Sequence, residues 1–146
     1  FLGYAGLAIL VRLSSRRLPD RVGPAKVLIA GIAFMSIGML GFSWVTAERT
    51  WLILIPAGLT GIGHSLMFHT MTSITLASFP TMVRGTGSIL ALMMLDLGTI
   101  LGAPVLGWIG EIYDYPVLFA CIGMTCFLSG VIFVVAERRQ NRLRDS

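Results

Sequence analysis

Four apolar segments, each long enough to cross a lipid bilayer as a helix, constrain this chain more than any other feature. A helix rises about 1.5 Å per residue and needs about 20 residues to cross the hydrocarbon core. The segments are residues 27–46, 51–77, 86–109 and 116–136. Only 12% of the residues are charged, about half the share of an ordinary soluble domain. We therefore expect an all-α, polytopic transmembrane helix bundle.

The predicted organisation is one bundle over residues 1–136, followed by a basic tail at 137–146. Short connectors join the spans, so that neighbouring helices run antiparallel. An apolar run at 1–11 is only about half a span long. The chain begins at Phe1 inside this run, without an initiator methionine. We expect the sequence to be a piece of a longer protein that starts in mid-helix.

Basic residues are unevenly distributed between the two sides of this bundle. If the spans alternate in direction, connectors 12–26 and 78–85 share one side with the tail, and that side holds every Lys and Arg except Arg49. Loops rich in Lys and Arg stay on the cytoplasmic side, and Trp and Tyr gather at membrane interfaces. The opposite interface holds Trp44, Trp51, Trp108, Tyr113 and Tyr115. We expect an integral protein of the cell (inner) membrane with cytoplasmic basic loops and C-terminus.

The first basic connector contains candidate gating residues, namely Arg17, Asp20, Arg21 and Gly23. Asp20 could accept hydrogen bonds from a helix N-terminus or an arginine, and so latch two helices together on the cytoplasmic face. Gly23 permits a turn before Pro24 opens the next helix. The alternative is a solvated loop whose arginines only fix the orientation.

This connector resembles the signature loop of the major facilitator superfamily, roughly G-x-L-x-D-R-x-G-R-[RK], which recurs between the eighth and ninth helices. The matching residues are Leu18, Asp20, Arg21 and Gly23. Arg16 replaces the first glycine, and Pro24 and Ala25 replace the closing basic pair. The stretch 84–115 is similar to the eleventh helix of efflux-type members, with its Asp-Leu-Gly and Gly-x-Pro.

The resemblance implies helices eight to twelve of a twelve-helix secondary transporter. Its N-terminal half would be the missing partner, and the two halves would rock around a site at the membrane midplane. The resemblance also implies a small organic solute as substrate, protons as the driving ion, and export. A non-transporting membrane scaffold or assembly subunit is the alternative.

The 86–109 segment contains the main candidate for the transport pathway. Asp96 lies near the predicted midplane, where an ionisable side chain is a functional candidate. Thr99 shares its stripe of the helix, which suits the lining of a water-filled path. Gly98 and Gly102 form a seam for close helix packing, and Pro104 can kink or unwind the helix. Asp96 could alternatively be a structural residue that holds two helices together.

Both histidines lie in the 51–77 segment. Gly61, with nearby glycines and a proline, makes its outer half pliable. Ser65 and His69 share the face of Gly61, and His64 lies about 100° to the side. Imidazole exchanges protons near neutral pH, so His64 or His69 beside Asp96 would form a proton-coupling pair. Neutral rings bonded to a neighbouring carbonyl are the alternative.

The sequence favours neither an enzyme nor a metalloprotein. Gly63-His64-Ser65-Leu66-Met67 lacks the closing glycine of a nucleophile elbow. Cys121 and Cys126 are five residues apart on a predicted helix and have no further ligands nearby, so they suit neither a disulfide nor a zinc site. We expect no catalytic residues, metal, cofactor or nucleic-acid partner, and membrane lipid as the surroundings.

Overall fold

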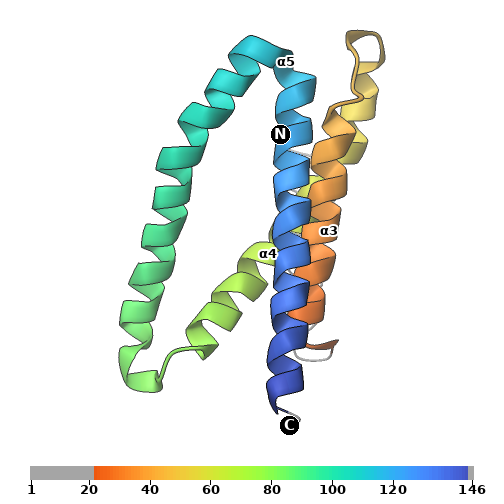
Figure 1. Ribbon diagram of the computed structural model, residues 1–146. Coiled ribbons are helices and arrows are strands. Elements are labelled where there is room, and N and C mark those ends of the chain that lie inside the picture. Colours follow the sequence, from red (N-terminus) through yellow and green to blue (C-terminus); the bar gives the residue numbers. More distant parts are fainter. Residues whose placement is uncertain (1–21, 145–146) are drawn as a thin grey trace.

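The computed structural model describes residues 22–144, all of whose regular elements are helices (Figure 1). The elements are α3 (Pro24–Phe42), η1 (Ala47–Ile53), α4 (Leu54–Ala77), η2 (Thr81–Val83) and α5 (Arg84–Arg144). The fold class is therefore the expected all-α bundle. The predicted half-helix at 1–11 and three predicted gating residues, Arg17, Asp20 and Arg21, lie outside the described residues.

Helix α5 folds back on itself at a single residue, Asp114. Its backbone there has φ 68° and ψ 164°, the one non-helical position inside α5. We call residues 84–113 the ascending limb and residues 115–144 the returning limb; they run in opposite directions in Figure 1. Pro116 lies at the start of the returning limb, where its missing N–H costs no helical hydrogen bond. The expected connector at 110–115 is thus reduced to one residue.

Three stretches of helix are long and apolar enough to cross a membrane: Pro24–Phe42, Glu48–Ala77 and Thr81–Arg139. Because α5 doubles back, the third stretch supplies two passes. The start of α3, the end of α4 and the end of the returning limb lie at one end of the structure (Figure 1). The described part therefore has the alternating arrangement on which the charge argument depends.

Helices α3 and α4 pack through glycines. A Cβ atom added to Gly63 would lie 2.5 Å from the Met35 backbone nitrogen, and one added to Gly38 would lie 2.8 Å from the Thr60 backbone nitrogen. Such close backbone approach suits a bilayer, where apolar side chains gain little by leaving lipid and packing itself holds helices together. The two helices therefore form the tightest part of the described structure.

The returning limb packs on another face of α3, again with glycines at the contact. A Cβ on Gly123 or on Gly130 would meet the side chain of Leu40 or Ile32 at 2.8 and 2.7 Å, respectively. The rings of Phe42 and Phe119 stack with their centroids 4.9 Å apart. Helix α3 is thus the centre of the described bundle, while the ascending limb stands apart from it (Figure 1).

We predict that Gly63→Ala destabilises the full-length protein by about 1–3 kcal/mol, because the added methyl group would overlap the backbone of α3. Thermal unfolding in detergent, followed by a fluorescent thiol or by aggregation, measures this effect. Gly107→Ala is the matched control, since nothing described lies within 4 Å of a Cβ there. Equal melting temperatures for the two variants would contradict the glycine packing.

We also predict that Asp114→Gly raises the melting temperature. A side chain at this φ and ψ is strained by about 1–3 kcal/mol, and glycine removes the strain. Asp114→Ala keeps a Cβ and loses the carboxylate, so it should lower the melting temperature. A glycine variant less stable than the alanine variant would contradict the strain, and a glycine variant less stable than the wild type would show that the aspartate side chain holds the turn.

Candidate functional site

An open groove lies between α4 and the ascending limb. It consists of two adjoining hollows of about 590 and 450 Å³, both lined by Met71, Ala91, Met94 and Leu95. We call the two together the α4–α5 groove. Its other lining residues are Phe68, Thr72, Thr75, Leu76, Ser88, Leu92, Gly98, Thr99, Gly102, Ala103 and Leu106. Each hollow has the volume of a pocket for a small organic ligand.

The groove arises because the ascending limb packs loosely. Every residue from 92 to 101 is exposed, and a Cβ on Gly98 or Gly102 would meet nothing within 4 Å. The glycine seam predicted on this limb therefore has no neighbour among the described residues. The backbone also stays helical through Pro104, so α5 shows no unwinding there.

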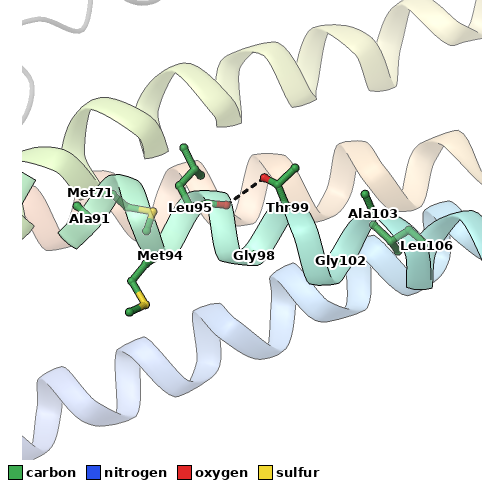
Figure 2. A pocket seen from close by; sticks show the side chains of 9 residues that line it. All are labelled: Met71, Ala91, Met94, Leu95, Gly98, Thr99, Gly102, Ala103 and Leu106. Atoms are coloured by element: carbon green, nitrogen blue, oxygen red, sulfur yellow. Dashed lines mark hydrogen bonds between the residues drawn. The ribbon is translucent and has the colours of Figure 1, made fainter. Parts of the chain in front are cut away.

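The polar side chains of the groove are four hydroxyls: those of Thr99 and Thr72 donate to their own helices, whereas Thr75 and Ser88 form no hydrogen bond among the described residues. Thr99 Oγ1 donates to the Leu95 carbonyl at 3.0 Å (Figure 2), and Thr72 Oγ1 donates to the Phe68 carbonyl at 2.9 Å. Serine and threonine commonly bond back to the preceding helical turn in this way. Their oxygens keep free lone pairs, so they present hydrogen-bond acceptors to the groove. No charged side chain is among the lining residues.

Asp96 lies at the edge of this groove. Residues three and four positions apart are neighbours on a helix surface, and Leu92 and Thr99, four before and three after Asp96, both line the groove. The side chain of Asp96 is exposed, and no described residue forms a hydrogen bond or ion pair with it. Within the described part, Asp96 therefore does not hold two helices together.

The two histidines are both exposed and lie on different faces of α4. The ring of His64 stacks on Phe68, with centroids 6.0 Å apart and planes 22° apart. Because Phe68 lines the groove, His64 is one residue removed from it. His69 lies outside the lining, and neither histidine is joined to Asp96 by a described contact. Ser65 and Gly61 are buried.

The structure thus gathers some of the predicted residues and separates others. Thr99, Gly98 and Gly102 line the groove, with Asp96 on its rim, whereas His69, Ser65 and Gly61 lie elsewhere on α4. Gly23 lies before α3 with φ 97°, and Pro24 opens that helix. In residues 22–144 no three His, Cys, Asp or Glu side chains are grouped to hold a metal ion.

Sequence reasoning missed the α4 wall of the groove. The lining residues of this wall recur every three or four positions along one face of α4. They include Phe68, Met71, Thr72 and Thr75. This periodicity was available in the sequence. The sequence does not say which helix faces this side of α4. Only the structure shows that residues 88–95 of the ascending limb lie opposite it.

Comparison with known proteins gives the family. A sequence model described as "Major Facilitator Superfamily" matches residues 1–146. An uncharacterized MFS-type transporter of Burkholderia mallei is 29% identical over 124 residues, which cover 85% of this chain and 30% of that protein. A relative of the same description from Pseudomonas aeruginosa is 28% identical over 141 residues, covering 95% of this chain and 34% of that protein.

The chain therefore spans about a third of the length of these curated relatives. No solved structure matches it. The spanning helices, the alternating topology and the family match agree on an integral membrane protein. Because the family match covers the whole sequence, the chain belongs to the major facilitator superfamily.

Proposed function

We propose that this chain supplies part of a secondary active transporter that moves a small organic solute by alternating access. The observation that carries the proposal is the ascending limb, which stands apart from the bundle and holds an unpartnered carboxylate, Asp96, beside an open groove. The described relatives are named as transporters, which supports the same class. A scaffold subunit would gain nothing from an unpaired carboxylate inside a membrane span, where an ionisable side chain is costly.

The packing suggests how the chain would move. Helices α3, α4 and the returning limb are joined through glycine contacts and would rock as one body. In transporters of this kind, binding sites lie between repeats or halves near the midplane. A second half of the full-length protein would cover the exposed face of the ascending limb and close the path around Asp96.

Asp96 is the proposed site of proton coupling. Residues 51–110 contain no other acidic residue, and ionisable groups inside membrane spans commonly belong to ion or substrate pathways. His64, whose ring stacks on the groove residue Phe68, is the candidate histidine partner with a described contact to the groove lining. Proton entry would drive export of the solute. This direction is suggested by the resemblance of residues 84–115 to efflux-type members.

The basic ends are proposed to face the cytoplasm in the cell (inner) membrane. In the described part, Lys26, Arg84, Arg138 and Arg139 belong to helix ends that lie together at one end of the structure, as the positive-inside rule requires. The connector containing Arg17, Asp20, Arg21 and Gly23 would lie at this same end. There it is proposed to latch the cytoplasmic gate.

We predict that Asp96→Asn abolishes proton-coupled transport. In everted vesicles containing the full-length protein, a panel of cationic, neutral and anionic organic solutes is added after respiration has acidified the interior. A transported solute releases protons, which a fluorescent pH dye reports. The wild-type response should fall at least about tenfold in Asp96→Asn, since the amide cannot carry the proton.

Glu111→Gln is the matched control for this experiment. Glu111 is an exposed acid on the same limb, close to the Asp114 turn, and its amide variant should respond like the wild type. Equal responses from Asp96→Asn and the wild type would exclude Asp96 as the coupling residue. A panel without any response would argue against proton antiport.

We also predict the orientation of the chain. In a background with Cys121 and Cys126 replaced by serine, Glu48→Cys should react with a membrane-impermeant maleimide in intact cells. Arg139→Cys should react only after the cells are permeabilised, because it lies at the basic end. Both positions are exposed. The reverse labelling pattern would place the basic loops outside the cell.

A further inference from the structure

We propose that the C-terminal end of the returning limb is a binding site for one anionic phospholipid. Arg138, Arg139 and Arg142, which we call the arginine triad, bind the phosphate of this lipid, and its acyl chains lie along an exposed apolar stripe of the same helix. The site is separate from the α4–α5 groove and does not depend on the transport function proposed above.

The arginine triad occupies one face of the helix. All three side chains are exposed, and α5 stays helical through them to Arg144. At 3.6 residues per turn they span about 100° of the helix circumference, with Arg142 between the other two. Arg142 is three and four positions from its companions, so the three are neighbours on the helix surface. No described residue forms an ion pair or hydrogen bond with any of them.

The triad lies at the rim of the packed helices. Gly123 lies against Leu40 and Gly130 against Ile32, so the returning limb and α3 run antiparallel. Continuing this register places Pro24, the first residue of α3, about level with the start of the triad. Figure 1 shows the end of the returning limb extending past the start of α3. The guanidinium groups are therefore at the level where lipid headgroups lie.

An exposed apolar stripe leads along the same face to the triad. Residues 116–136 contain no charged side chain and are long enough to cross the hydrocarbon core. The glycines that contact α3 point about 120° away from the stripe. The stripe recurs every three or four residues and ends one turn before the arginines. Its members are Met124, Leu128, Val131 and Val135, which are 44–61% exposed.

The triad lacks a neutralising acid on its own face. Glu137 is seven residues after Gly130, so it continues the face turned toward α3, and it is only half-exposed. The helix dipole favours cations in the last turn alone, which accounts for Arg142 and leaves Arg138 and Arg139 unexplained. Neighbouring like charges on a helix repel each other, and an external anion would relieve this repulsion.

A phospholipid fits both the triad and the stripe. Guanidinium groups bind phosphate oxygens through paired hydrogen bonds, and basic clusters next to a membrane span attract anionic lipids. A free phosphate would use the arginines alone and leave the apolar stripe uncovered. A lipid with a choline headgroup would bring a cation close to the triad. The chemistry of this face therefore favours phosphatidylglycerol over phosphatidylcholine.

Lipid binding to the full-length protein in detergent tests the proposal. Phosphatidylglycerol and phosphatidylcholine with identical acyl chains are titrated separately, and native mass spectrometry measures the affinity of the first bound lipid. We expect phosphatidylglycerol to bind at least about tenfold more tightly. The triple variant Arg138→Gln, Arg139→Gln, Arg142→Gln should lose this preference. Equal affinities in the wild type, or an unchanged preference in the triple variant, would overturn the proposal.

A relocated arginine separates a defined site from general surface charge. Arg142→Gln combined with Gln140→Arg keeps the number of cations and therefore the orientation in the membrane, but moves one arginine about 160° around the helix. Affinity for phosphatidylglycerol should fall about fivefold. Arg84→Gln is the matched control, because it removes an exposed arginine from the same end of the structure and should bind like the wild type.

A relocated variant with wild-type affinity would show that the position of the charge is irrelevant and would refute the site. An Arg84→Gln variant as weak as the triple variant would refute it too. If glycerol phosphate displaces phosphatidylglycerol at equal concentration, the triad recognises a free phosphate and the lipid proposal is wrong. A full-length protein that binds neither lipid would show that its other helices cover this face. None of these outcomes bears on Asp96 or on proton release.

Discussion

Close backbone contact around α3 is the constraint on which the rest of this structure depends. In lipid, helices gain little from burying apolar side chains, so they associate where small residues let their backbones meet. Gly38 and Gly63 provide this contact between α3 and α4, and Gly123 of the returning limb provides it at Leu40 of α3, while Gly130 packs against the Ile32 side chain. These contacts make three helices into one unit. In the described part the ascending limb has no glycine contact with α3 or α4, since Gly87 meets only the Phe79 side chain before the limb and Gly98 and Gly102 meet nothing, and for that reason it can border an open groove.

The groups proposed to carry function in this chain lie where packing is weakest. The ascending limb has glycines too, but Gly98 and Gly102 face open space instead of a neighbouring backbone. The same limb holds Asp96, which a tightly packed helix would have to pair or neutralise. The Thr99 hydroxyl bonds to its own helix, so it does not tie the limb to a neighbouring helix. The division into three helices packed as one unit and a loosely attached limb fits the alternating-access function proposed above.

Much of this architecture could be predicted from the sequence. Apolar length and charge placement predict the spans and their alternation, because a bilayer allows few alternatives. The one-residue turn at Asp114 was not predictable, since a six-residue connector with two acidic residues and two tyrosines commonly forms a longer loop. The groove was predicted only in part: Asp96 and Thr99 follow from helical periodicity, whereas Met71 and Thr72 depend on which helix faces which. Pairing between helices is a tertiary property that periodicity within one helix does not contain.

The Asp114 turn also makes the ascending limb a lever. A helix of this length extends about 45 Å, and its connection to the firm unit at that end is a single residue with left-handed φ. A rotation of about 5° at this joint would displace the opposite end by about 4 Å, close to the width of a methyl group. Small dihedral adjustments at the Asp114 end of the limb would therefore widen or narrow the α4–α5 groove toward its other end.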